Sequence, residues 1–269
     1  MKPPLTYYGG KQKLSAIITS MIPKHHTYCE PFFGGGAIFF SKAPSIIEVI
    51  NDTNGELINF YRVIKTKFKQ IQREIRATLH SRELHRQAAK TVLGYPELFS
   101  DIKRAWAIWV LANQSYGSMI GTSSTWGYDK SKNSAAKRLH HKRENFTEEY
   151  ARRLEKAQIE NIDALRVIET RDRKDTFFYC DPPYYNSDCG HYNGYLEQDF
   201  ENLLKVLSKI KGKFLLSSYP CELVEKYAKE NKWFVKKIDM ALSITAKYKT
   251  GKRKTEVLMG NYPLPEGLT

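Results

Sequence analysis

A short apolar and aromatic run that ends in two consecutive prolines constrains the fold more than any other feature. Residues 177–180 are typical of a buried strand, and Asp181-Pro182-Pro183-Tyr184 follows them directly. Because proline offers no N–H to a β-ladder, the chain must turn at the carboxyl end of this strand. In an open α/β sheet, ligands bind outside that end of the strands. The sequence therefore predicts a site that carries a carboxylate and an aromatic ring.

The chemistry that this motif suits is attack by an exocyclic amine. Asp181 and the carbonyl of Pro182 can each accept a hydrogen bond from an amino group whose lone pair is otherwise conjugated with a base ring. Tyr184 can stack on that base. Taken alone, the motif also fits a rigid Pro-Pro turn in which the aspartate only caps the end of a strand.

The length and the cysteine usage narrow the class of protein. The 269 residues suffice for one large domain or for a core domain with an insertion. No apolar run is long enough to span a membrane, and the first residues do not resemble a secretory leader, so we expect a cytoplasmic protein with no membrane partner. The cysteines and histidines lack metal-ligand spacing, so neither zinc nor disulfides are expected. Cys29 and Cys180 fall in predicted strands and are expected in the core.

The charge balance indicates a polyanionic partner. The formal net charge is +14 and the sequence pI is about 9.4, which favours nucleic acid, although a merely basic protein has the same balance. Basic residues cluster in two segments, 130–143 and 247–254, among Gly, Ser, Asn and Tyr. Such loop-like, basic segments are suited to phosphate contact.

Strands and helices alternate at both ends of the chain, which predicts a doubly wound α/β fold. Strands are expected at 27–33, 45–50, 176–180, 213–218, 233–238 and 255–262, and helices at 37–42, 55–65, 163–170, 198–210 and 222–229. Between them, residues 66–153 show helical segments, the best at 99–114, and no convincing strand. A stretch this long without strands indicates an inserted, mainly helical domain. The predicted organisation is therefore a core domain, 1–65 with 154–269, and an insertion, 66–153.

A glycine segment follows the first predicted strand and precedes a helix. Gly34-Gly35-Gly36 lets the backbone approach a ligand, and the amides of the following helix favour a negative group. Phe39 occupies the third glycine position of the dinucleotide fingerprint, and the acidic Glu30 precedes the loop. S-adenosylmethionine has an amino group, a carboxylate and no pyrophosphate, and fits these residues better than a dinucleotide does. A tight strand-to-helix turn is the alternative interpretation.

Asp52 ends the second predicted strand, 18 residues after Gly34. A carboxylate at that point commonly binds ribose hydroxyls. The alternative is that Asp52 or Asn54 caps the helix that follows. Both roles can coexist on neighbouring residues.

Four motifs occur in an order that resembles the Dam-type, or D12 class, DNA adenine-N6 methyltransferases. They are residues 4–11, 30–36, Asn51-Asp52 and Asp181-Pro182-Pro183-Tyr184, and the segment 243–262 is similar as well. The resemblance implies a Rossmann-like methyltransferase sheet and S-adenosylmethionine as the cofactor. It implies methyl transfer to N6 of adenine in double-stranded DNA, by base flipping and direct displacement. A bacterial or phage-encoded protein acting at the nucleoid is expected, and the sequence leaves open whether a cognate restriction endonuclease is a further partner.

The resemblance also assigns roles to residues. The expected catalytic residues are Asp181, Pro182, Tyr184 and Lys11. The expected cofactor contacts are Tyr7, Tyr8, Gly10, Lys11, Glu30, Phe32, Gly34, Gly36, Asp52, Asp163 and Asp181.

The resemblance implies that the insertion 66–153 is the target-recognition domain. Within it, residues 113–143 mix amides and aromatics with Lys and Arg, as base and phosphate contacts require. The expected DNA-binding residues are Asn113, Gln114, Tyr116, Tyr128, Lys130, Lys137, Arg138, Lys252 and Arg253. Segments 113–117 and 126–129 differ from the recognition segment of GATC-specific relatives, which leaves the target sequence open.

Three other functions compete with this interpretation. Methylation of cytosine at N4 uses a similar amine, although such enzymes more often carry Ser in place of Asp181. Methylation of RNA or of protein glutamine is usually associated with Asn-Pro-Pro-Tyr. A catalytically silent DNA-binding module would keep the fold, but every expected catalytic position of this chain is filled.

Overall fold

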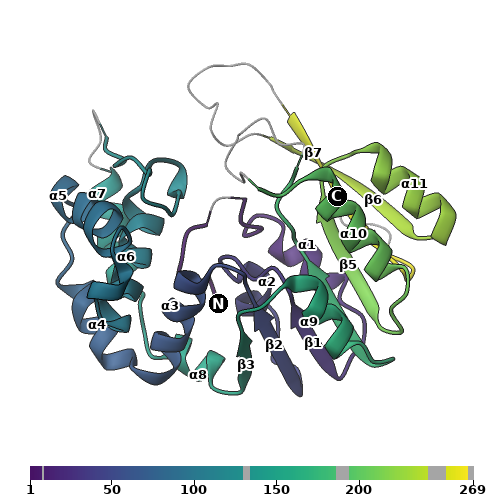
Figure 1. Cartoon of the computed structure of the whole chain (residues 1–269), viewed down its shortest axis with the longest axis horizontal. Helices are drawn as coiled ribbons and strands as arrows, with labels where there is room; N and C mark the ends of the chain where they lie inside the picture. The colour runs from purple at the N-terminus through teal and green to yellow at the C-terminus, as the bar shows by residue number, and fades with distance from the viewer. Residues whose placement is uncertain (8, 130–133, 186–193, 242–252, 266–269) are drawn as a thin grey trace. The chain divides into compact units, whose positions relative to one another are not determined.

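The computed structural model describes residues 1–7, 9–129, 134–185, 194–241 and 253–265 (Figure 1). Its strands are β1 Thr27–Glu30, β2 Ile47–Asn51, β3 Ala157–Glu160, β4 Thr176–Cys180, β5 Lys213–Ser218, β6 Phe234–Ala241 and β7 Arg253–Gly260. They form one seven-stranded sheet in the order β3-β2-β1-β4-β5-β7-β6. Strand β1 is parallel to β2 and β4, β4 is parallel to β5, and β7 is antiparallel to both β5 and β6. The prediction of a doubly wound α/β sheet is confirmed.

The helices between the strands agree closely with the predicted ones in the core part of the chain. The α-helices are α1 Ser15–Ser20, α2 Ala37–Ser41, α3 Gly55–Thr66, α4 Phe68–Arg76, α5 Arg82–Arg86, α6 Asp101–Gln114, α7 Ser134–Glu144, α8 Glu149–Leu154, α9 Ala164–Arg171, α10 Glu197–Leu207 and α11 Glu222–Asn231. A π-helical turn, η1 Gln87–Val92, and two 3-10 turns, η2 Pro96–Leu98 and η3 Tyr116–Ser118, complete them. The described part of the insertion is helical, as predicted, although helix α7 within it was not predicted. Outside the insertion, helix α1 and strand β3 were not predicted.

The chain divides into two compact units. The first unit comprises residues 1–19, 33–44 and 51–161, and the second comprises 20–32, 45–50 and 162–269. The first unit contains the whole predicted insertion together with the glycine segment, so it is larger than the insertion alone. That residues 66–153 recognise the target sequence stays a prediction.

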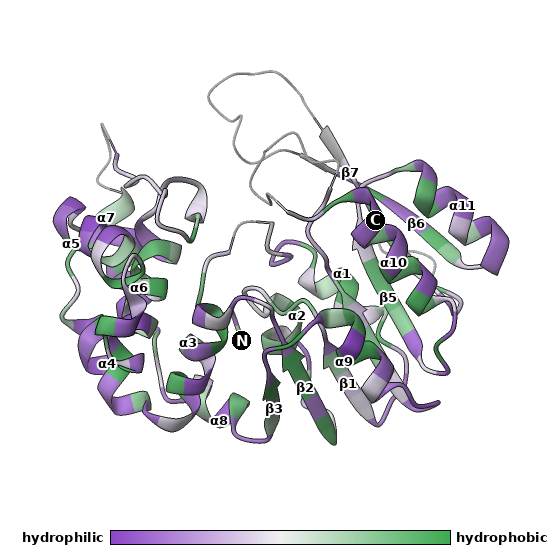
Figure 2. Cartoon of the chain, in the orientation of Figure 1, coloured by the Kyte–Doolittle hydropathy of each residue, from purple (hydrophilic) through white to green (hydrophobic). Residues whose placement is uncertain are grey.

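The core of the second unit lies between the sheet and the helices that follow β4. Every residue of β4 is buried, as are the apolar residues of α10, namely Phe200, Leu203, Leu204 and Leu207. Helices α9 and α10 lie side by side, and both α10 and α11 carry hydrophobic and hydrophilic residues together (Figures 1 and 2). Burying each such side chain contributes about 1.5–3 kcal/mol. Cys29 and Cys180 are buried in this core, as expected.

Helix α6 is the centre of the first unit. Its residues from Ala105 to Ala112 are all buried, and the indole Nε1 of Trp106 donates a hydrogen bond of 2.8 Å to Thr78. Helix α7 has one buried residue, Leu139, and a guanidinium, Arg143, that donates to the carbonyl of Thr78 at 2.8 Å. These long-range contacts explain why a helix forms in a sequence with little apolar periodicity.

None of the helices in the described residues combines the length and the hydropathy that a membrane span requires. In the same ranges, no group of three or more His, Cys, Asp and Glu side chains could hold a metal ion.

Candidate active site

The second unit carries two acidic residues at the carboxyl ends of neighbouring parallel strands. Glu30 is the last residue of β1, and Asp181 follows the last residue of β4. The strand order reverses between β1 and β4, which is where open α/β sheets bind ligands. Glu30 is buried and accepts a hydrogen bond from the hydroxyl of Tyr28. The sheet therefore fixes both carboxylates at the expected position.

Tyr184 links Asp181 to a third carboxylate. Its hydroxyl lies 3.2 Å from Oδ1 of Asp181 and also donates to Oε1 of Glu256, a residue of β7 that is 0% exposed. The ring of Tyr184 packs edge-on against Tyr219, with 4.4 Å between ring centroids. Burial raises the pKa of Tyr184 well above its usual value, and the charges of Asp181 and Glu256 add to this effect. The phenol is therefore neutral and acts as a hydrogen-bond donor.

The charges of three carboxylates, Glu30, Asp181 and Glu256, all influence the pKa of Tyr179. Burial raises the pKa of Tyr179 first, the charges of Asp181, Glu30 and Glu256 raise it further, and a hydrogen bond with Ser217 at 2.9 Å opposes them. A region with this much negative charge suits an amino group that gains positive character as it reacts. Glu256 was not among the residues predicted for the site, although an acidic residue inside an otherwise apolar strand is a sequence signal that could have indicated it.

The first unit holds the glycine segment and Asp52. Gly34 donates its N–H to Oδ2 of Asp52 at 2.9 Å, and its carbonyl accepts from the hydroxyl of Tyr61 at 2.9 Å. Oδ1 of Asp52 accepts from the N–H of Asn54 at 2.9 Å. Burial raises the pKa of Asp52, whereas the hydrogen bonds from Asn54 and Gly34 lower it. Asp52 therefore holds the glycine loop in place.

Asp52 was predicted either to bind ribose or, like Asn54, to cap helix α3, and the structure shows which residue caps the helix. The side chain of Asn54, not that of Asp52, caps α3 by accepting from the N–H groups of Glu56 and Leu57 at 3.1 and 3.2 Å. A carboxylate has about four acceptor positions, and backbone amides occupy two of those of Asp52. The capping role thus falls on Asn54, and Asp52 retains the capacity to accept from ribose hydroxyls.

Tyr7 packs closely over the glycine segment. A Cβ at Gly34 would lie 3.2 Å from the ring of Tyr7, and one at Gly35 would lie 2.8 Å from its Cβ. The N–H of Gly10 donates to the carbonyl of Tyr7 at 3.0 Å, and Nζ of Lys11 donates to the carbonyl of Gly9 at 3.0 Å. The glycines therefore admit a tyrosine ring close to the loop backbone. Tyr8 lies outside the described residues.

We expect Gly36→Ala to destabilise the protein by about 1–3 kcal/mol. Gly36 has a φ of 67°, and a Cβ there would lie 2.6 Å from the ring of Phe33, which is itself buried. Gly34→Ala is the matched control, because its φ is 49° and its new Cβ would meet Tyr7 at 3.2 Å. Urea denaturation measures both variants. Equal losses of unfolding free energy would contradict the role of the Phe33 contact.

Two further predicted cofactor contacts belong to the second unit. Asp163 caps α9, since its Oδ1 accepts from the N–H groups of Leu165 and Arg166 at 2.9 and 3.1 Å. Phe32 is half-buried against the core of the unit. The structure thus gives Asp163 a structural role, and its contact with the cofactor stays a prediction.

Gln114 has a different environment from the one predicted for a base contact. It is 1% exposed, its Oε1 accepts from the N–H of Ser81 at 3.0 Å, and its Nε2 donates to the carbonyl of Leu79 at 2.9 Å. Its neighbour Asn113 donates its Nδ2 to the carbonyl of Trp109 at 2.8 Å. Because both the oxygen and the nitrogen of its side-chain amide already form hydrogen bonds, Gln114 holds segment 79–81 in place, a role different from the predicted base contact.

Two aromatic residues that were predicted to contact DNA lie at the surface of the first unit. Tyr116 and Tyr128 are exposed, and Tyr128 stacks on Trp126 with ring centroids 5.4 Å apart and an interplanar angle of 17°. The guanidinium of Arg82 lies 5.0 Å from the ring centroid of Trp126. Trp126 belongs to the segment 126–129 named from the sequence, whereas Arg82, 44 residues earlier, was not predicted to contact DNA.

The remaining predicted DNA contacts are basic. Lys137 and Arg138 are exposed on α7. Arg253 is the first residue of β7, and Lys130 and Lys252 lie outside the described residues.

Comparisons with known proteins identify the family. Residues 7–242 match the model of the D12 class N6 adenine-specific DNA methyltransferases. A type II methyltransferase of Lactococcus lactis subsp. cremoris, M1.LlaDCHI, is 27% identical over 284 residues, which cover 97% of this chain and 96% of the relative. The chain belongs to the D12 class, and it is an adenine-specific DNA methyltransferase.

Solved structures resemble this chain only distantly. A precorrin-8w decarboxylase from Methanobacterium thermoautotrophicum is 9% identical, with a TM-score of 0.42 and coverage of 98% of this chain and 96% of that chain. A precorrin-6y C5,15-methyltransferase from Geobacter metallireducens is 8% identical, with a TM-score of 0.42 and coverage of 97% and 98%.

Proposed function

We propose that this methyltransferase uses S-adenosylmethionine to methylate N6 of adenine within a specific sequence of double-stranded DNA, after the base has left the duplex. The observation that carries the proposal is the position of Asp181 and Tyr184, which are hydrogen-bonded at 3.2 Å beside the carboxyl end of β4. The amino group of adenine is paired inside a duplex, so it can reach these residues only as a flipped base.

The residues of the second unit act on the amine. Asp181 and the carbonyl of Pro182 accept its two N–H groups, which draws the nitrogen lone pair out of conjugation with the ring. The nearby charges of Glu30 and Glu256 favour the positive charge that develops on the nitrogen. Tyr184, held by Glu256, presents its ring to the base.

The residues of the first unit bind the cofactor, which supplies an electrophilic methyl group when bound. Asp52 fits this group, because its carboxylate is fixed by two backbone amides and retains acceptor positions for ribose hydroxyls. Lys11 and Tyr7, which also belong to the first unit, would contact the cofactor as well. In the second unit, Glu30 and Phe32 would contact the methionine end of the cofactor.

The proposal is tested by incubating the protein with duplex DNA and methyl-labelled S-adenosylmethionine, and then identifying the labelled nucleoside. We expect N6-methyladenine. Labelled N4-methylcytosine would instead support methylation of cytosine at N4. DNA binding without any labelled nucleoside would support a catalytically silent DNA-binding protein. The Lactococcus relative is a type II methyltransferase. We therefore also propose that a cognate restriction endonuclease exists and that methylation protects the host DNA from it. The methyltransferase would act at the nucleoid of a bacterial host.

Tyr184→Ala should weaken capture of the flipped adenine, because base stacking on an aromatic face contributes about 1–3 kcal/mol. Tyr184→Phe is the matched control: it retains the ring and loses only the hydroxyl that donates to Glu256. A 2-aminopurine at the target position reports extrusion by its fluorescence. Equal signals from wild type and Tyr184→Ala would leave Tyr184 as a packing residue. A mispaired target should reduce the defect of Tyr184→Ala, because less pairing energy is then lost on flipping.

A further inference from the structure

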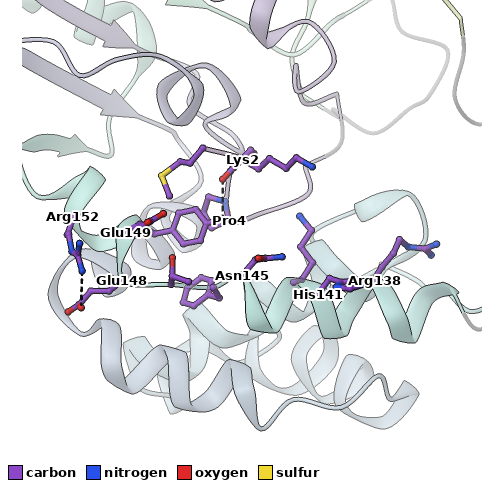
Figure 3. A pocket seen from close by; sticks show the side chains of 14 residues that line it. Lys2, Pro4, Arg138, His141, Asn145, Glu148, Glu149 and Arg152 are labelled. Carbon is purple, nitrogen blue, oxygen red and sulfur yellow. Dashed lines mark hydrogen bonds and ion pairs between the residues drawn. The ribbon is translucent and has the colours of Figure 1, made fainter.

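A basic pocket lies within the first unit, beside the N-terminal segment 2–4 and the helices α7 and α8 (Figure 3). Its volume is about 790 Å³. Its lining includes five basic side chains, Lys2, Arg138, His141, Lys142 and Arg152, and two acidic ones, Glu148 and Glu149. Among the described residues of the family motifs, only Pro4 lines this pocket, so the motifs do not account for it.

Helix α7 presents three of these side chains on one face. Arg138, His141 and Lys142 are related by steps of three and four residues, which places them on the same side of a helix. Leu139 and Arg143 anchor α7 to the rest of the unit through burial and through the carbonyl of Thr78. The basic face is therefore held in position and does not depend on a ligand for its shape.

Lys142 and Lys2 are neighbours of like charge. Lys142 is half-buried, and its pKa is lowered first by burial and then by the charge of Lys2. Among the described residues, no ion pair joins either lysine to a carboxylate. Of the two glutamates in the lining, Glu148 pairs with Arg152 at 3.6 Å, and Glu149 forms no ion pair with Lys2 or Lys142. Placing two cations close together in a partly desolvated pocket is unfavourable unless an anion binds between them.

We propose that this pocket binds a phosphate group of the DNA backbone, held by Lys2 and Lys142 with Arg138 and His141 beside it. The proposal rests on the proposed action on double-stranded DNA and adds a contact outside the catalytic motifs. A polyanion is favoured over a free phosphate because the exposed Lys137 continues the basic surface of α7, and the whole chain carries +14.

The double variant Lys2→Gln/Lys142→Gln tests the site in the full-length protein. Lys69→Gln/Lys90→Gln is the matched control, because it removes two exposed lysines from the same unit. Fluorescence anisotropy measures the affinity for one duplex over a range of salt concentrations. We expect the pocket variant to bind about tenfold more weakly, with a salt slope smaller by about 0.9 for each lost phosphate contact. The control should stay near wild type.

The outcomes separate this proposal from the proposed function. Equal affinities and equal salt slopes for the pocket variant and the control would overturn the phosphate site, whereas absence of methyl transfer by the wild type would contradict the proposed function instead. Inorganic phosphate provides a second arm. If it raises the melting temperature of the wild type while the pocket variant binds DNA normally, the site takes free anions and the DNA contact is overturned. Circular dichroism checks folding, and Lys142→Met should melt at or above the wild-type temperature, because it removes a desolvated charge.

Discussion

Replacing Asp181 with alanine is expected to lower the rate of methyl transfer by about 10²–10³ or more, while DNA binding stays near that of the wild type. Removing one well-placed polar group from a transition state typically costs this much. Asp181 follows β4 directly, so the sheet fixes its position, and its Oδ1 lies 3.2 Å from the hydroxyl of Tyr184. Alanine removes the acceptor but leaves the Pro-Pro turn intact.

Two control variants make this prediction specific. Asp181→Asn keeps one acceptor oxygen and loses the charge, so its rate should lie between those of the wild type and Asp181→Ala. Asp175→Ala removes an exposed carboxylate from the same unit, and its rate should be unchanged. Single-turnover methylation with saturating DNA measures the chemical step. A near-normal rate for Asp181→Ala would remove Asp181 from the reaction.

Asp52→Ala should raise the dissociation constant of the cofactor by about one to two orders of magnitude. A hydrogen bond to a charged acceptor contributes roughly 1.5–3 kcal/mol, and this carboxylate also holds the N–H groups of Gly34 and Asn54. Loss of Asp52 therefore removes a ribose acceptor and loosens the glycine loop. Isothermal titration calorimetry with S-adenosylmethionine measures the affinity.

Asn54→Ala separates cofactor binding from helix capping. It removes the cap of α3, which should lower the unfolding free energy by about 0.5–2 kcal/mol, and it should leave the cofactor affinity near that of the wild type. Unchanged affinity in Asp52→Ala, or an equal loss in both variants, would assign Asp52 a structural role only.

The sequence predicted the helices and strands that form because of a local pattern of apolar residues. Continuous apolar runs gave strands β4 and β5 with their observed ends, because their residues are almost all buried. Strand β3 was missed, since it has four residues, of which Gln158 is exposed. Helix α7 was missed because its anchors lie in distant segments: Arg143 bonds to Thr78, which is 65 residues away.

The residues of the candidate site also differ in whether local sequence marks them or whether their contacts come from distant segments. Motif and spacing predicted that Asp181, Tyr184 and Asp52 follow strand ends, as they do in the structure, and the roles of these residues stay predictions. The role of Gln114 could not be predicted, because an amide that closes a loop looks the same in sequence as one that reads a base. Its partners Ser81 and Leu79 are 33 and 35 residues away. Glu256 required the pairing of β7 beside β5 before its contact with Tyr184 could be seen.

Methylation-sensitive long-read sequencing of DNA from a host that expresses this protein is the most direct test of its action. A host that expresses Asp181→Ala at the same level is the control. We expect N6-methyladenine at one recurring sequence with the wild-type protein and no such modification with the variant. Modification of cytosine at N4, or unmodified DNA from a host with folded wild-type protein that binds S-adenosylmethionine, would contradict site-specific adenine methylation.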